Sequence, residues 1–214
     1  MLGRPTSLAD GGNIVAKNWG TPAGVRVGQW FPDRRSLTLA YVHRPPQNGI
    51  SGNGIEGADS IVVSGGYVDD EDHGTHLFYT GMGGNDRKSK RQVADQDPAA
   101  SGNAGLGVSW RRELPVRVIR GPHKGSPFAP ATGYVYSGLY LVTDSWVERG
   151  RDGFKVIRFR LDAVEGQVNL DIVSPGLFDV SNGAKSELDR LLALIAAEAA
   201  DLCLLYTSPS PRDS

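Results

Sequence analysis

The sequence predicts an α+β domain that is rich in β-strands. Its 214 residues include 28 glycines and 13 prolines, which favour short strands joined by turns over long helices. The composition, 39% hydrophobic and 22% charged, is typical of a globular protein. The length suffices for one well-buried domain with extensions and is too short for two large domains. We therefore expect a single core.

Six short segments carry strand signals, and clusters of Gly, Pro and Asp separate them. They are residues 36–42, 61–64, 76–80, 116–120, 134–143 and 155–161. In the last segment Ile157, Phe159 and Leu161 alternate with Arg158 and Arg160, so one face should pack inward and the other should meet solvent or a ligand. This pattern predicts a twisted sheet or barrel.

The C-terminal part has a different character. From Ser186 onward aliphatic residues recur at helical spacing, which predicts a helix. The last twelve residues resemble the translation of a sequencing adapter, so we leave them out of the fold and expect the natural chain to continue beyond about Leu202. The predicted division is an N-terminal extension over 1–19, a domain over 20–165, a linker with the start of a helical element over 166–202, and adapter sequence over 203–214.

The sequence also argues against several classes of protein. No apolar run approaches the roughly 20 residues of a membrane span, and residues 1–5 lack the apolar stretch of a signal peptide. The only cysteine, Cys203, excludes an internal disulfide or a cysteine-based zinc site. We expect a protein that stays inside the cell, in a reducing compartment.

Charge is segregated along the chain although the net charge is only −1. Residues 51–80 hold six acidic side chains and no Lys or Arg, whereas residues 81–130 hold nine Lys or Arg against four acidic residues. A protein that grips a phosphate backbone while offering carboxylates to base amino groups needs such a division. Two unrelated solvated surfaces would explain the charges equally well.

An ordered set of motifs lies between Ser64 and Gln96. It begins with Gly-Gly-Tyr67, continues through Asp-Asp70-Glu-Asp-His-Gly and Tyr79-Thr-Gly-Met-Gly-Gly, and ends with Asp-Gln96. The set resembles the SET- and RING-associated (SRA, or YDG) family almost position by position. Further matching motifs lie at 27–30, 43–45, 49–52, 115–120, 133–134 and 138–140, so the resemblance covers about residues 20–161.

The resemblance implies a twisted, crescent-like β-barrel flanked by helices, with a pocket that holds a methylated or otherwise modified cytosine flipped out of double-stranded DNA. Tyr67 and Tyr79 match the family's pocket tyrosines, which replace the stacking that the base has lost. Asp70 matches the carboxylate that accepts from the cytosine amino group, where thymine has a carbonyl. Thr80 matches a further pocket position. Gly65 and Gly66 would let the backbone approach the base closely.

The long, polar and basic connection from Gly81 to Gln96 is the expected site of contact with DNA. Its cations would meet phosphates, and in this family such a loop also sends a side chain into the gap left by the base. The vertebrate Asn-Lys-Arg finger is absent, which makes Arg91 or Gln92 the candidate for insertion. The residues assigned to the backbone or to the vacated stack are Arg87, Lys88, Lys90, Arg91 and Gln92.

Several alternatives remain open. A divalent metal at Asp70, Asp72, His73 and His76 fits no zinc spacing, so we expect neither metal nor cofactor, and we interpret Asp69, Glu71 and Asp72 as turn formers or solvated charges. No nucleophile with its base is visible, so the chain itself is not expected to be an enzyme. The short loops are most like those of bacterial members joined to a C-terminal HNH nuclease, which would act in the cytoplasm. The rivals are a nuclear chromatin reader of DNA methylation and a β-domain that has lost its pocket.

Overall fold

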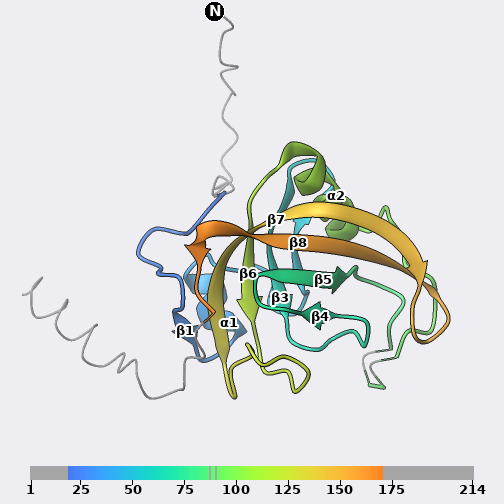
Figure 1. Ribbon diagram of the computed structural model, residues 1–214, viewed down its shortest axis with the longest axis horizontal. Helices are drawn as coiled ribbons and strands as arrows, with labels where there is room; N and C mark the ends of the chain where they lie inside the picture. The colour runs from blue at the N-terminus through green and yellow to red at the C-terminus, as the bar shows by residue number, and fades with distance from the viewer. Residues whose placement is uncertain (1–18, 87, 90, 171–214) are drawn as a thin grey trace, which may run out of the picture. The chain divides into compact units, whose positions relative to one another are not determined.

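The computed structural model describes residues 19–86, 88–89 and 91–170, and these form a β-rich unit (Figure 1). The described residues contain eight strands and two helices. In chain order they are β1 (Trp30–Phe31), α1 (Arg34–Leu39), β2 (Ile50–Asn53), β3 (Gly57–Val63), β4 (Glu71–Asp72), β5 (His76–Thr80), α2 (Ser101–Arg112), β6 (Val116–Arg120), β7 (Tyr134–Arg149) and β8 (Lys155–Val168).

The strands form one mixed, open sheet in the order β2-β3-β6-β7-β8-β5-β4, and β1 pairs with β7 beside this path. β3 and β6 are parallel, and the other pairs are antiparallel. The connection between β3 and β6 spans about a quarter of the chain and contains β4, β5, the long basic loop and α2. The β-rich fold that the sequence predicts is confirmed.

β7 and β8 are the longest strands and run side by side as the two long arrows of Figure 1. The prediction of strands at 134–143 and 155–161 is confirmed, but both strands continue further because their polar outer halves still pair as a hairpin. Two register shifts interrupt the pairing, near Gly138 and Val142, and such bulges bend a strand pair. β8 reaches Val168 and therefore passes the domain boundary predicted at 165.

The core lies on both faces of β3 and β6. Ile61 and Val63 face a large cluster that includes Leu106 of α2, whereas Val62 faces a smaller cluster that includes Leu37 of α1 and Tyr136 of β7. All seven residues of β3 are buried for this reason. The pocket described below forms where β3 and β5 meet the loops that precede β2 and follow β5.

The strand predicted at 36–42 is wrong, because residues 36–39 belong to α1. Asp33 caps the helix by accepting a hydrogen bond from the Ser36 amide (2.8 Å). Leu37 is fully buried but Leu39 is 71% exposed, so the two residues lie on different faces, as in a helix and not as in a strand. The sequence signal for this helix is its cap residue, Asp33, whereas Thr38, Tyr41 and Val42 are residue types that favour a strand.

α2 was not predicted, because glycines interrupt its sequence and no side chain caps its start. The glycines are explained by close packing. A Cβ at Gly102 would lie 2.6 Å from the Met82 sulfur, and one at Gly105 would lie 3.0 Å from the Asn53 nitrogen. The helix therefore approaches β2 and the start of the basic loop more closely than an ordinary side chain would allow.

The predicted helix from Ser186 and the predicted adapter sequence over 203–214 lie outside the described residues, as does most of the predicted extension over 1–19. In the part of the chain that the structure describes, neither helix is long and apolar enough to cross a membrane.

Candidate functional site

A pocket of about 600 Å³ is lined by two loop segments and by the sheet beneath them. We call residues 45–49, which precede β2, the 45–49 wall, and residues 81–96, which follow β5, the 81–96 loop. The wall contributes four lining residues, Pro46, Gln47, Asn48 and Gly49, and the loop contributes Met82, Gly83 and Asn85. The remaining lining residues are Arg34, Val62, Ser64, Gly66, Tyr67, Asp70, Tyr79 and Tyr134.

Asp70 brings a half-buried carboxyl group into the pocket. Its Oδ1 accepts a hydrogen bond from the backbone amide of Thr80 (2.8 Å), which fixes the carboxyl group at the end of β5. Burial raises the pKa of Asp70 to about 7, although the bonds from Thr80 and the positive charge of Arg158 act in the opposite direction. The group is therefore poised between its neutral and ionised forms near neutral pH.

Tyr67 and Tyr79 both line the pocket, as the sequence predicts for a pair of stacking rings. Tyr79 is 4% exposed, and its hydroxyl lies 3.5 Å from the Val62 carbonyl. Burial and the nearby Asp70 raise the pKa of Tyr79 well above its usual range, so the hydroxyl stays protonated. The Tyr67 hydroxyl accepts from the Gly83 amide (2.8 Å) and so ties the ring to the 81–96 loop.

The other predicted pocket residues divide between the lining and the layer behind it. Gly66 lines the pocket, and its carbonyl accepts from the side chain of Asn85 (3.0 Å). Gly65 lies behind, with a φ of +66° and the ring of His123 so close that a Cβ would sit 2.4 Å from it. Thr80 lies behind the lining too; it is fully buried and acts on the pocket through its bond to Asp70.

Arg158 is a buried cation beneath the acidic turn, where the sequence indicated a face toward solvent or a ligand. It is 3% exposed and donates to the Asp69 carbonyl and to the Thr80 hydroxyl (3.2 Å). It also forms ion pairs with Glu71 (3.3 Å) and Glu148 (3.4 Å). Arg158 therefore supports both residues that frame the Asp70 carboxyl group, a role that strand alternation alone does not reveal.

Arg34 is a lining residue that the sequence did not indicate. It comes from the first turn of α1, and its guanidinium group lies 5.7 Å from the centre of the Tyr134 ring, a cation–π contact. Its Nη2 donates to the Pro45 carbonyl (3.0 Å) and to the Asn48 carbonyl. Arg34 thus bonds to the 45–49 wall at Pro45 and at Asn48.

Three side-chain amides hold the 81–96 loop. Gln96 donates to the Gly81 carbonyl (2.5 Å), and Asn103 of α2 both donates to and accepts from the backbone of Met82. Gln92 donates to the carbonyls of Gly83 (3.0 Å) and Ala94 (2.7 Å). These bonds fix both ends of the loop, at residues 81–83 and 92–96.

The basic residues of this loop have different surroundings. Lys88 is exposed, whereas Arg91 pairs with Asp152 of the β7–β8 hairpin (2.8 Å) while its side chain remains 72% exposed. Gln92 is only 5% exposed, so insertion into a DNA stack requires it to leave the loop bonds described above. Arg87 and Lys90 lie outside the described residues. The assignment of these five residues to DNA remains a prediction.

The acidic run contains structural charges, not only turn formers or solvated ones. Asp72 forms a two-point ion pair with Arg120 (both contacts 2.8 Å), and both side chains are 1% exposed. Asp69 is 7% exposed and accepts from the Arg151 amide (3.0 Å). Across the described residues, no group of three or more histidine, cysteine or acidic side chains is arranged to hold a metal ion.

Comparison with known proteins shows the family to which the chain is similar. The SAD/SRA domain matches residues 18–167. A UHRF1-like protein of Cryptococcus neoformans is 40% identical over 162 residues, which cover 71% of this chain and 47% of that protein. The chain thus spans about half the length of this relative, and about a fifth to a quarter of the next curated relatives.

Two solved structures are similar in both fold and sequence. The modification-dependent TagI restriction endonuclease is 42% identical with a TM-score of 0.67, over 74% of this chain and 56% of that chain. The SRA domain of SUVH5, solved with hemimethylated CG DNA, is 40% identical with a TM-score of 0.61, over 72% of this chain and 99% of that chain. The resemblance predicted from the motifs is confirmed.

Proposed function

We propose, because this chain belongs to the SAD/SRA domain family, that it binds duplex DNA containing a modified cytosine and holds that base, flipped out of the helix, in the pocket. The base would lie against the rings of Tyr67 and Tyr79 with its amino group toward Asp70. Extrusion of a base costs a few kcal/mol of lost stacking and pairing, and each tyrosine face can return about 1–3 kcal/mol.

The observation that carries this proposal is a carboxyl group that shares one pocket with two tyrosine rings. An ionised Asp70 accepts from the cytosine amino group but repels the carbonyl that thymine presents at the same position. Tyr79 does not provide the same selectivity, because its protonated hydroxyl can accept from an amino group and can equally donate to a carbonyl. The pocket therefore combines stacking surfaces, which tolerate any base, with one group that distinguishes between bases.

A binding titration tests the proposal. One duplex sequence is prepared with cytosine, 5-methylcytosine, 5-hydroxymethylcytosine, glucosylated hydroxymethylcytosine or thymine at a single position. We expect at least one modified cytosine to bind more tightly than plain cytosine, and thymine to bind no better than plain cytosine. Equal affinity for all five duplexes would refute base recognition and leave a β-domain that binds DNA without reading it.

For the intact protein, we propose that this domain is the reader module of a modification-dependent HNH restriction endonuclease that acts in the cytoplasm. The support is its 42% identity to the TagI restriction endonuclease, of which it covers 56%. The domain itself would bind and another part of the protein would cut. The natural sequence beyond residue 202, read from the source DNA, tests this, because an HNH nuclease motif is recognisable by sequence.

A second candidate is a nuclear chromatin reader of DNA methylation. It is favoured by the 40% identity to a UHRF1-like protein and by comparable identity to histone-lysine N-methyltransferases of Arabidopsis thaliana. The same sequencing distinguishes the two, because a SET or RING domain after residue 202 would identify the chromatin protein.

A further inference from the structure

We propose that His43 is a positioning residue, which holds the 45–49 wall in the shape that receives the flipped base. The inference rests on the proposed function, because it gives the wall a part in base recognition. His43 does not line the pocket; it lies behind the wall with no exposed surface.

The 45–49 wall is held mainly by its carbonyl groups. It begins with two prolines, Pro45 and Pro46, which have no N–H to donate. The Gly49 carbonyl accepts from the Val62 amide of β3 (2.8 Å). The Asn48 carbonyl, in the middle of the lining, accepts from Nε2 of His43 (2.9 Å) and from Arg34. Two side chains from different segments thus converge on one carbonyl oxygen of the wall.

The hydrogen bonds of His43 define its tautomer. A carbonyl oxygen can only accept, so the bond to Asn48 requires the hydrogen on Nε2. Burial, with the nearby Arg34 charge, lowers the pKa of His43 to about 3, so the ring is neutral. Its Nδ1 then accepts the single hydroxyl hydrogen of Ser60 (2.9 Å), for which the Asp59 carboxylate, at 3.3 Å from the same hydroxyl, is the more distant acceptor. Both ring nitrogens are satisfied, and the ring has one orientation.

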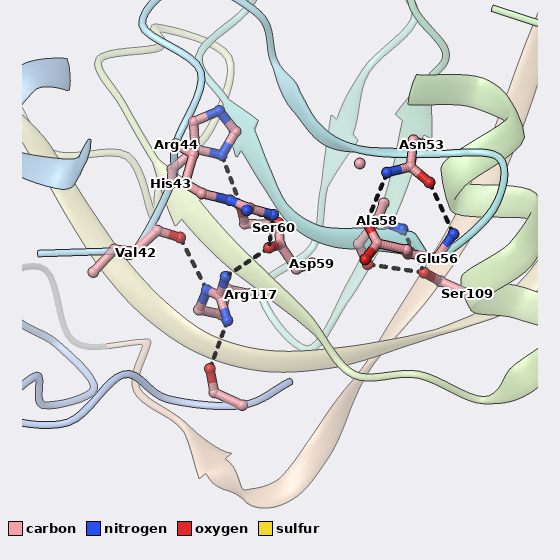
Figure 2. A network of polar contacts seen from close by, with 12 residues as sticks. Val42, His43, Arg44, Asn53, Glu56, Ala58, Asp59, Ser60, Ser109 and Arg117 are labelled. Carbon is pink, nitrogen blue, oxygen red and sulfur yellow. Dashed lines mark hydrogen bonds and ion pairs between the residues drawn. The ribbon is translucent and has the colours of Figure 1, made fainter. Parts of the chain in front are cut away.

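A buried ionic network fixes the backbone on both sides of His43, as Figure 2 shows. Arg117 donates to the Val42 carbonyl (2.9 Å), and Asp59 pairs with Arg44 (2.8 Å) and with Arg117 (3.4 Å). Asp59 and Arg117 are each 1% exposed. Both neighbours of His43 in the chain are therefore anchored to buried residues of β3 and β6, and this anchoring reaches the wall through the imidazole ring.

Three variants separate positioning from ordinary core packing. His43→Leu introduces an apolar side chain of similar size and removes both hydrogen bonds. His43→Gln retains one donor and one acceptor and should rescue the wall. Ser109→Ala is the matched control: Ser109 is fully buried, bonds to the nitrogen and the oxygen of Ala58 (2.9 and 2.8 Å; Figure 2) and lines no part of the pocket.

Two independent measurements test the proposal: hydrogen exchange reports on the structure of the wall, and a binding titration reports on DNA recognition. Hydrogen exchange of the free protein, followed in a peptide that covers residues 44–50, should become about tenfold faster in His43→Leu, with no change over residues 81–96. Affinity for the preferred modified duplex should fall roughly tenfold, the scale of one lost buried hydrogen bond, while affinity for the unmodified duplex changes less than about twofold. His43→Gln should recover most of both, and Ser109→Ala should lower only the melting temperature.

The proposal would be overturned if folded His43→Leu exchanged hydrogen over the wall at the wild-type rate. It would also be overturned if exchange became faster while the preference for modified over unmodified DNA stayed the same. If His43→Leu does not fold, Ser60→Ala, which removes the bond to Nδ1 together with the 3.3 Å contact to the Asp59 carboxylate, is measured in the same way with a smaller expected change. Wild-type protein that binds modified and unmodified DNA equally would refute the proposed function instead. The exchange measurement on free protein distinguishes that failure from a wall that never depended on His43.

Discussion

The two segments that form the pocket walls are held in different ways. The 45–49 wall is gripped by Arg34 and by His43, whose neighbours are fixed by the buried Asp59–Arg117 pair. The 81–96 loop is held by neutral amides and, near its tip, by the pair of Arg91 with Asp152, in which the Arg91 side chain is 72% exposed. Exposed ion pairs contribute about 0–1 kcal/mol, so the loop tip can exchange partners more easily than the wall can.

This difference suggests that the two regions have different functions in DNA binding. The 45–49 wall and the Asp70 turn offer a preformed surface, which suits discrimination between bases. The 81–96 loop carries exposed cations and an ion pair that a phosphate could replace, which suits affinity for any DNA. The predictions below test whether discrimination and general affinity belong to these separate regions.

The largest effect is expected at Asp70, on the side of discrimination. Asp70→Ala removes the only group proposed to accept from the cytosine amino group and should cost about 1–3 kcal/mol for modified DNA. Unmodified DNA should bind nearly as before, so the preference is lost. Titration of both duplexes, with circular dichroism to verify folding, measures this. Full discrimination in a folded variant would show that another group reads the base.

The next largest effect on binding is expected at the pocket tyrosines, and two substitutions of Tyr67 separate the contribution of its ring from that of its hydroxyl. Tyr67→Ala removes a stacking face and should weaken binding of modified DNA by about 1–3 kcal/mol. Tyr67→Phe keeps the ring but removes the hydroxyl that accepts from the Gly83 amide, so it should cost only about 0.5–1.5 kcal/mol. Equal losses in the two variants would mean that Tyr67 acts by tethering the 81–96 loop and not by stacking.

Binding should also depend on pH through Asp70. The pKa of about 7 in the free protein lies above the usual 3.8, so the free folded state favours the protonated form and loses stability as pH rises from about 4 through 7. Binding, in contrast, requires the ionised form. Affinity for modified DNA should therefore increase between pH 6 and 8, by up to about tenfold per unit below the pKa.

Asp70→Asn provides the control for this pH profile, because it cannot titrate and should give a flat response over the same range. An affinity that instead increases toward pH 6 in the wild type would indicate that a protonated Asp70 donates to a ring nitrogen of the base. That result would keep Asp70 in the pocket but reverse its role.

The smallest effect is expected at the loop tip. Lys88→Gln should weaken binding to modified and unmodified DNA alike and reduce the slope of log affinity against log salt concentration by about one. Arg111→Gln, on the exposed side of α2, provides a matched loss of one charge away from the pocket and should leave the slope unchanged. A loss confined to modified DNA would move Lys88 into the discriminating region.

The sequence predicted the residues that line the pocket better than the residues that support it from behind. Tyr67, Asp70 and Tyr79 lie in a single run, so the motif that identifies them also places them near one another, and the structure brings all three to one pocket. The contacts of Arg158 and His43 were not predicted, because the partners of Arg158 are distant in sequence and one partner of His43 is a backbone carbonyl, which no motif reveals. The Arg158 contact with Asp69, for example, joins residues 89 positions apart.

The sequence pattern also does not show which charged or polar side chains are buried. Alternation in β8 indicated that Arg158 faces solvent or a ligand, whereas it is enclosed by acidic partners. Likewise, Gln92 reads as part of an exposed basic loop, but its amide satisfies the loop backbone. Burial of a polar side chain depends on which partners the tertiary fold supplies, and periodicity carries no information about those partners.

The most direct test of the central claim is to detect the flipped base. A fluorescent base analogue placed beside the modified cytosine should emit more strongly when the protein binds, because extrusion removes a stacked neighbour that quenches it. A mismatch opposite the modified cytosine should tighten binding, because it lowers the cost of extrusion. Unchanged emission together with affinity that is insensitive to the mismatch would contradict the account and would indicate that the modification is read within an intact duplex.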